Sequence, residues 1–353
     1  MIPYWIMFGI PAFGALFEQP GRKLAHRGER GLFIVAVVTA AILVGMRYKV
    51  GADWSTYVEY LVRASYTELA DIPGSSDPGY VFVNWLVANW GFDVWLVNLL
   101  CASLFASGLW AFALVQPRPW LAFVIAVPYL VIVAAMGYTR QGVAIGLAMH
   151  GLAALGGKDK SNVKFVLWIL LAAVFHKSAV LLIPIAALAQ DRGRAWTLFW
   201  VTGASILAYF TLLESSVDML TTNYIDAQYD SGGAAIRVAM NAFPALLLIF
   251  FRNRFLFRVN EKSTWMILAV LALLLVPALV LSPSSTAVDR LGLYLIPLQL
   301  MVLSRVPDSF GKSERSTNSL ALAVILYSGA VQFVWLTFAT HAQYWLPYQF
   351  YPF

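Results

Sequence analysis

Long apolar segments separated by shorter polar connections run through the whole chain. Twelve such segments can be drawn, and the longest approach the roughly 20 residues that a helix needs to cross a bilayer. They cover residues 2–17, 32–46, 94–115, 120–136, 141–155, 165–175, 179–189, 195–213, 234–251, 264–281, 291–303 and 320–338. The pattern predicts an all-α polytopic membrane protein with one transmembrane domain over residues 1–353.

The segments 165–175 and 179–189 are too short to be ordinary spans. Eleven helical residues rise about 16 Å, roughly half of the hydrocarbon core. Because both flanks are basic, we expect two short helices that meet at His176, Lys177 and Ser178, with the polar apex lining a cavity in the outer half of the membrane. A single 25-residue helix is the competing interpretation.

Two longer polar connections, 47–93 and 214–233, interrupt the apolar pattern. In the first, Asp77 and Pro78 form a good helix start, with Asp as the cap and Pro at the first position. The residues 79–90 that follow carry Tyr and Trp, which is typical of a helix lying at the membrane interface. A short buried helix is the alternative.

Composition agrees with a membrane protein and charge orients it. Hydrophobic residues make up 60% of the chain and charged residues 12%, and the mean hydropathy is +0.73. Six connections hold most of the Lys and Arg and are predicted to be cytoplasmic, which places both termini outside. These connections are 18–30, Arg118, 158–164, 192–194, 252–262 and 305–315. The first apolar segment is predicted to be a membrane span that stays in the protein rather than a cleaved signal peptide. The net charge of +6 reflects this topology rather than a nucleic-acid partner.

A few cations depart from this sorting and are predicted to lie on the outer side. They are Arg47, Lys49, Arg63, Arg140, Lys177, Arg237 and Arg290. A charge at bilayer depth costs roughly 2.5 to 3.5 kcal/mol on insertion scales. Cations placed at the outer ends of apolar segments therefore suggest binding of an anion.

Other chemistry is less favoured. The single cysteine, Cys101, lies inside an apolar segment, and the four histidines lack the spacing of a metal site. No P-loop, GxGxxG or DxD motif is present. We therefore expect no cofactor and no metal, and nucleotide-dependent catalysis is disfavoured.

Seven short strings resemble the EpsG family of bacterial exopolysaccharide assembly proteins, and together they extend over nearly the whole chain. They are VGADWSTY at 50–57, DPGY at 77–80, GYTRQG at 137–142, FHKSA at 175–179, SGGAAIR at 231–237, DRLGLY at 289–294 and WLPY at 345–348.

The resemblance implies a Wzy-like polymerase or related membrane glycosyltransferase of the C-type fold (GT-C). Such an enzyme acts at the outer face of the bacterial cytoplasmic membrane during exopolysaccharide or O-antigen synthesis. Its expected partners are a polyprenyl-diphosphate-linked oligosaccharide, the growing glycan, membrane lipid and other polysaccharide assembly proteins. No nucleic acid is expected.

Two residues are candidates for orienting or deprotonating the acceptor hydroxyl. Asp53 follows an apolar segment and precedes Trp54 and Tyr57, whose rings could pack against sugars. His176 titrates near neutrality in its ordinary state and lies at the predicted apex. The alternatives are a helix cap for Asp53 and a hydrogen-bonded turn residue for His176.

Arg and Lys side chains suit a departing diphosphate, since the Arg fork matches phosphate oxygens and keeps its proton. The expected diphosphate-binding residues are Arg140, Arg290, Arg237 and Lys177. Arg140 opens a helix, whereas Arg290 could instead form a salt bridge with the adjacent Asp289. The expected sugar- and acceptor-binding residues are Trp54, Tyr57, Tyr80, Gln141 and Tyr294.

Two other classes of protein remain open. A lipid-linked oligosaccharide flippase or anion transporter would carry polar residues in the middle of several spans, often with repeat symmetry. Here the polar clusters gather toward one face, and no repeat is visible. A membrane acyltransferase that modifies the glycan would need a catalytic histidine and an acyl donor. Metal-independent glycosyl transfer is therefore the favoured activity.

Overall fold

A computed structural model of residues 1–353 describes residues 1–18, 27–156, 161–188, 199, 202–203, 232–258, 261–282 and 284–352. The regular elements of the described residues are all helices, and their extended backbone pairs only in an isolated antiparallel bridge between Arg47 and Phe350. Its helices are α1 (Ile2–Leu16), α2 (Arg27–Gly45), α3 (Trp54–Ala64), η1 (Leu69–Gly74), α4 (Pro78–Asn89), α5 (Val94–Leu114), α6 (Pro119–Ala126), the π-helix η2 (Val127–Ala135), α7 (Thr139–Gly156), α8 (Asn162–Phe175), η3 (Lys177–Leu182), α9 (Ile183–Leu188), α12 (Ala234–Phe250), α13 (Lys262–Leu281), α14 (Ser285–Leu293), α15 (Ile296–Phe310), α16 (Glu314–Phe338) and η7 (Thr340–Tyr344).

Four of the described helices are long and apolar enough to cross a membrane. They are α2 over Gly28–Gly45, α5, α13 and α16, and the pair α14–α15, bent by 52°, would make a fifth. An all-helical membrane protein is thus confirmed, whereas twelve apolar segments and the GT-C fold are not. Most of the expected segment 195–213 and most of the expected loop 214–233 lie outside the described residues.

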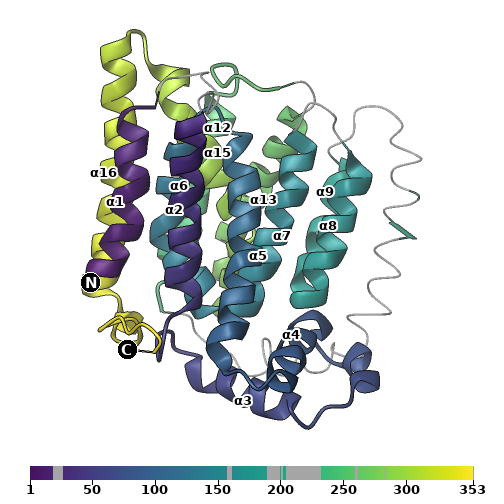
Figure 1. The fold of residues 1–353 in the computed structure, drawn as a ribbon. Coiled ribbons are helices and arrows are strands. Elements are labelled where there is room, and N and C mark those ends of the chain that lie inside the picture. The colour runs from purple at the N-terminus through teal and green to yellow at the C-terminus, as the bar shows by residue number, and fades with distance from the viewer. Residues whose placement is uncertain are drawn as a thin grey trace.

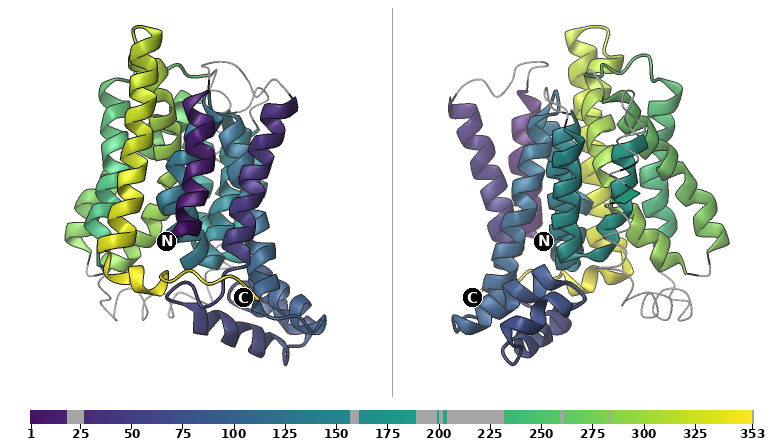
Figure 2. Two further views of the ribbon diagram at one scale, coloured as in Figure 1. Left: turned by 60° about the vertical axis from the view of Figure 1, so that its left-hand side comes forward. Right: turned by 90° about the vertical axis from the view of Figure 1, so that its right-hand side faces the viewer.

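The helices stand side by side in a bundle with two distinct ends (Figures 1 and 2). One end carries α3, α4 and the C-terminal residues, and both chain termini lie toward it; we call this the hairpin end. At the opposite end α1 ends and α2 begins. The connections between α5 and α6, α7 and α8, α12 and α13, and α15 and α16 lie at the same end. We call it the basic end, because the connections predicted to be cytoplasmic join these helices. Which side of the membrane each end faces stays a prediction.

The predicted break at His176 is present. Helix α8 ends at Phe175, and His176 is extended, with φ −156° and ψ 111°. The short helix α9 then contacts α8, so the chain turns back rather than continuing as one 25-residue helix. With 14 residues, α8 rises about 21 Å, which is less than the thickness of the hydrocarbon core.

Close helix packing holds α7 against α5. Helices α5 and α7 approach each other at Gly108 and Gly146, where a Cβ added to Gly108 would lie 1.8 Å from the Gly146 carbonyl oxygen. Before α7, the residues of α6 and η2 are all buried. A π-helix is uncommon and often marks a functional site, and this one leads directly into residues 137–141.

Candidate functional site

Arg140 is the second residue of α7, so its charge lies at the positive end of that helix. Its Nη1 is 2.6 Å from Oδ2 of Asp77, and its guanidinium lies 4.9 Å from the centre of the Tyr60 ring. Asp77 precedes α4 as expected but makes no capping hydrogen bond and pairs with Arg140 instead. The Arg140 side chain remains 28% exposed, which leaves part of its fork open to a ligand.

Arg290 occupies the last turn of α14 and reaches the start of α7. Its guanidinium lies 3.8 Å from the centre of the Tyr138 ring. The side-chain amide of Gln141 donates to the Arg290 carbonyl oxygen at 2.7 Å, and Arg290 Nη1 donates to Gln141 Oε1 at 3.5 Å. No carboxylate of the described chain forms an ion pair with Arg290. Its positive charge is therefore not neutralised there.

His176 follows the last residue of α8 and lies within the field of both arginines. Burial, together with the smaller effect of the charges of Arg140 and Arg290, lowers the pKa of His176 to about 3. Its Nδ1 is buried and has no hydrogen-bond partner among the described residues. Arg140, His176 and Arg290 thus lie near one another, and the low pKa makes the imidazole a weak base.

Asp53 lies at the start of α3 without capping it. Its half-buried carboxylate makes no hydrogen bond or ion pair to any described residue, so the capping interpretation does not account for it. Burial raises the pKa of the nearby Tyr57, Arg140 lowers it and Asp53 raises it, so both charges act on this ring. Tyr57 therefore lies within electrostatic range of both the candidate base and a candidate diphosphate ligand.

The expected sugar-binding residues occupy different depths. Tyr57 is 5% exposed, Tyr80 1%, Gln141 2% and Tyr294 4%, whereas Trp54 is half-buried. The Tyr57 hydroxyl accepts a hydrogen bond from the Thr139 backbone at 2.9 Å. These buried side chains support the walls of the site, and Trp54 retains an accessible ring.

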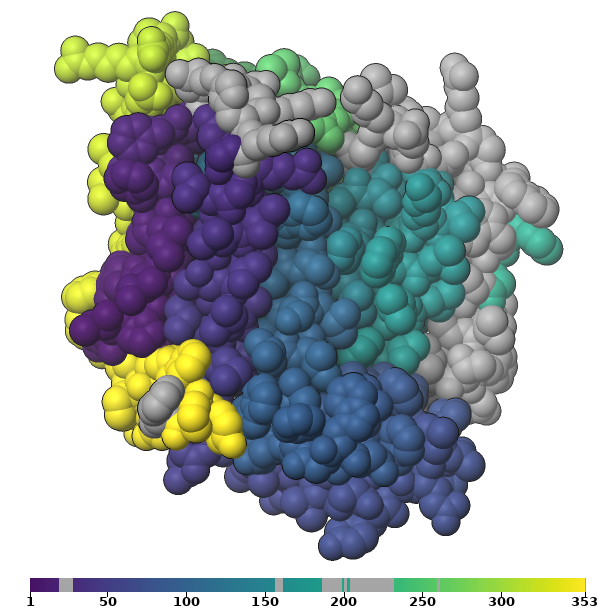
Figure 3. Space-filling model, viewed as in Figure 1, coloured from purple at the N-terminus to yellow at the C-terminus, as the bar shows by residue number. Residues whose placement is uncertain are grey.

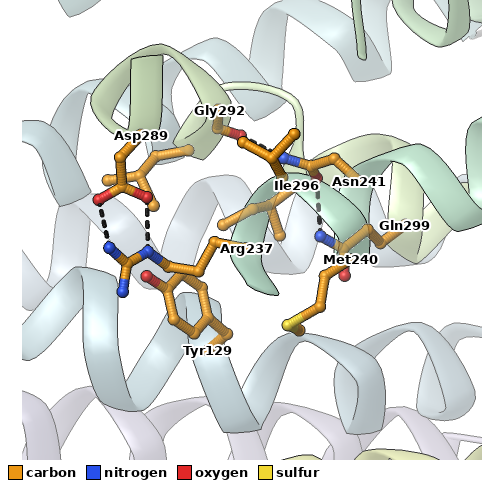
Figure 4. A pocket seen from close by; sticks show the side chains of 10 residues that line it. Tyr129, Arg237, Met240, Asn241, Asp289, Gly292, Ile296 and Gln299 are labelled. Carbon is orange, nitrogen blue, oxygen red and sulfur yellow. Dashed lines mark hydrogen bonds and ion pairs between the residues drawn. The ribbon is translucent and has the colours of Figure 1, made fainter. Parts of the chain in front are cut away.

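Arg237 lies one turn into α12 and binds Asp289 of α14 with two hydrogen bonds, Nε to Oδ1 at 2.5 Å and Nη2 to Oδ2 at 2.8 Å (Figure 4). Asp289 thus pairs with Arg237 rather than with the adjacent Arg290. Beside this pair, Asn241 donates to the Gly292 carbonyl oxygen at 2.9 Å. These residues and Tyr129 line a small cavity of about 10 Å³, which has room for about one water molecule. These contacts hold α14 on α12.

Lys177, the first residue of η3, lies beside Asp77. Burial raises the pKa of Asp77, while the charges of Arg140 and Lys177 and a hydrogen bond from the Lys177 main chain lower it. Asp77 therefore connects the start of α4 with two of the four predicted diphosphate-binding residues.

The three remaining cations predicted to lie on the outer side, Arg47, Lys49 and Arg63, differ from one another. Arg63 is exposed and lies 3.8 Å from Glu59 one turn earlier, and Lys49 is exposed over the Tyr48 ring. Arg47, by contrast, is fully buried. Its guanidinium donates to Asn98 Oδ1 at 3.2 Å and to Thr139 Oγ1 at 2.8 Å. In the sequence it resembles a residue that merely flanks an apolar segment, and no local signal reveals these partners.

A sequence model of the EpsG family matches residues 31–350, nearly the whole chain. This match confirms the resemblance carried by the seven strings. No curated protein and no solved structure matches the chain.

Proposed function

The chain belongs to the EpsG family, and on that premise we propose that it is a glycosyltransferase that polymerises polyprenyl-diphosphate-linked oligosaccharide units. We place this reaction at the outer face of the bacterial cytoplasmic membrane. The supporting observation is the charge of Arg290, which no described carboxylate neutralises and which lies with Arg140 around the neutral His176. A lipid diphosphate carries its charge at the membrane surface, where such a pair of arginines would meet it.

In this proposal Arg290 and Arg140 bind the departing diphosphate. Charge-assisted hydrogen bonds from guanidinium groups are strong, and the start of α7 adds the positive end of a helix. Asp77 occupies one edge of the Arg140 fork and orients the rest. The buried Nδ1 of His176 has no partner among the described residues. In the tautomer that carries the proton on Nδ1, it can donate a hydrogen bond to a phosphate oxygen.

Lys177 and Arg237 have different duties here. Lys177 adds positive charge next to Asp77. Arg237 uses its fork on Asp289, and Asp289 directly precedes Arg290. We therefore assign Arg237 the task of holding α14, and through it Arg290, in place.

Asp53 is the proposed general base, because its carboxylate is half-buried and unpaired among the described residues. The acceptor hydroxyl oxygen forms a bond to the anomeric carbon while its proton passes to the Asp53 carboxylate. The bond from the anomeric carbon to the diphosphate oxygen breaks, and polyprenyl diphosphate leaves with the electron pair. Trp54, next to this carboxylate, offers a ring against which the acceptor sugar can pack.

The test is extension of lipid-linked repeat units by purified protein in vesicles, read as a ladder of product lengths. We expect Asp53→Asn to lower turnover about 10²–10⁴-fold, as loss of a general base does. Arg290→Gln should cost about 10²–10³-fold, as loss of a transition-state donor does. Arg63→Gln is the matched control, because Arg63 is an exposed cation at the same end.

The products also separate the proposal from its alternatives. Lipid that crosses the bilayer without being extended would indicate a flippase, and acylated sugar would indicate an acyltransferase. Either result, or full turnover by both Asp53→Asn and Arg290→Gln, would contradict the proposed function.

A further inference from the structure

Arg47 is a charged residue with no exposed surface. Among the described residues it has no carboxylate partner. Removing an unpaired charge from water is costly unless its donors are fully engaged. The acceptors of its donors therefore decide whether this charge can be accommodated.

Four acceptors surround the guanidinium. Nε donates to the Val50 carbonyl oxygen at 3.2 Å, and Nη1 donates to that of Val44 at 2.7 Å. Nη2 donates to the Asn98 and Thr139 side chains at 3.2 and 2.8 Å. These acceptors belong to the last turn of α2, the turn after it, α5 and the first residue of α7. One side chain therefore joins its own stretch, residues 44–50, to two helices, α5 and α7, that are distant from it in the sequence.

Two of these segments carry the proposed chemistry. Val50 lies three residues before Asp53, and Thr139 directly precedes Arg140. Thr139 also donates through its backbone to the Tyr57 hydroxyl on α3, the helix that begins after Asp53. Arg47 thus connects the turn that leads to the candidate base with the helix start that presents a candidate diphosphate ligand.

The C-terminal residues 340–352, here called the C-terminal strap, hold the same turn from its other side. The Gly51 backbone donates to the Tyr344 carbonyl oxygen, and the Tyr48 backbone donates to that of Gln349, each at 2.9 Å. Figure 3 shows the strap in yellow, lying against the hairpin end below α1. With the strap on one side, the Arg47 side chain connects this turn to α5 and α7.

We infer that Arg47 is a positioning residue that sets the separation between Asp53 and Arg140. This inference rests on the proposed function, in which Asp53 activates the attacking hydroxyl and Arg140 binds the departing diphosphate. The planar fork of arginine can reach several acceptors in fixed directions at once, whereas the single ammonium of lysine cannot. Charge alone at this position would therefore not reproduce the geometry.

Arg118 provides a matched control. Its side chain is 1% exposed, but it lies at the basic end and pairs with Asp308 through Nε and Nη2. Arg118→Lys therefore makes the same chemical change in an equally buried place that is remote from Asp53 and Arg140.

The first measurement compares kcat and KM of Arg47→Lys and Arg118→Lys in vesicles, per folded molecule. We expect Arg47→Lys to lower kcat about 10–100-fold, since small misplacements of reacting groups have effects of this size. The KM for the lipid donor should change little. Arg118→Lys should lower the unfolding temperature without this loss of kcat.

A second pair of variants keeps the inference testable if Arg47→Lys does not fold. Thr139→Val removes one acceptor of Arg47, and Thr139→Ser retains the hydroxyl. We expect kcat to fall in the Val variant and to be restored in the Ser variant. In an Asp53→Asn background, Thr139→Val should lower the residual rate only about threefold or less, because residues that act as a unit are not additive.

An unchanged kcat in both Arg47→Lys and Thr139→Val would overturn the inference, and so would equal losses in Thr139→Val and Thr139→Ser. Additive losses in the Asp53→Asn background would also overturn it, because Arg47 would then act independently of Asp53. The proposed function fails by a different result, namely no chain extension by the wild-type protein.

Discussion

At the basic end the guanidinium of Arg118 is buried against the carboxylate of Asp308, whereas at the hairpin end Arg47 is equally buried without any carboxylate among the described residues. A second pair repeats the contrast. Arg305 pairs with Glu261 at 2.6 Å, with both side chains 4% exposed, but Arg290 lies on the Tyr138 ring with no described anionic partner.

The difference separates charge that a carboxylate neutralises from charge that keeps its electrostatic field. A guanidinium bonded to a buried carboxylate is already neutralised and attracts an incoming anion only weakly. One held by neutral acceptors or an aromatic ring keeps its field, which is stronger where water is excluded. The hairpin end also contains arginines that are paired with a carboxylate, here called closed pairs, namely Arg140–Asp77 and Arg237–Asp289. The two ends therefore differ in that the hairpin end has further arginines beyond its closed pairs, the buried Arg47 and the half-buried Arg290.

The largest expected effect comes from breaking a closed pair at the basic end. Arg305→Gln leaves Glu261 buried without its partner, which should lower the free energy of unfolding by about 3–5 kcal/mol. Turnover per folded molecule should remain near that of the wild type. Unfolding in detergent and the extension assay measure the two quantities. If turnover per folded molecule fell as much in Arg305→Gln as in Arg290→Gln, paired arginines at the basic end would matter for catalysis as much as the unpaired Arg290 at the hairpin end. The contrast between the two ends would then be wrong.

An intermediate effect is expected on anion binding. Inorganic diphosphate should inhibit chain extension by occupying the site around Arg290 and Arg140. Arg290→Gln should raise its inhibition constant about 10–100-fold, the equivalent of one charged hydrogen bond. Arg63→Gln at the same end is the control. Equal inhibition of the wild type and Arg290→Gln would place the anion elsewhere.

The smallest expected effect is a gain. Asp77→Asn removes the carboxylate that pairs with Arg140 and so converts a closed pair into an open cation. Because Arg140 is partly exposed, we expect diphosphate inhibition to tighten only about two- to fivefold, while kcat falls as Arg140 loses its orientation. Asp308→Asn makes the same change at the basic end and should leave inhibition unaltered. Weaker inhibition in Asp77→Asn would show that this carboxylate does not compete with the anion.

Local features of the structure were accessible from the sequence. The apolar pattern anticipated both ends of α5 and α13 and the C-terminal end of α16, and Asp77 and Pro78 marked the start of α4. The break at His176 followed from the basic flanks on either side of two short apolar segments. Each of these features depends on neighbours within a few turns, which is the range over which hydrophobic periodicity and helix-start signals act.

Pairings between distant segments were not accessible. Arg237 and Asp289 are 52 residues apart, and the sequence favoured the adjacent Arg290 as the alternative partner of Asp289. Asp77 looked like a cap because nothing near it reveals Arg140, 63 residues later. Most of the expected sugar-binding side chains proved to be buried, since composition does not show which face of a helix packs inward.

The sequence by itself determined the membrane class, the family, the polar break after α8 and the set of cations gathered toward one end. Only the tertiary structure decided which of them are neutralised by a carboxylate and which are not. It also showed that Arg47, which in the sequence only flanks an apolar segment, is buried and binds Thr139, 92 residues later. The physical reason is that hydropathy fixes how deep a segment lies in the membrane. The partner of a charged side chain depends instead on which helices touch and on how each is rotated about its axis, and close contacts such as Gly108–Gly146 set that rotation.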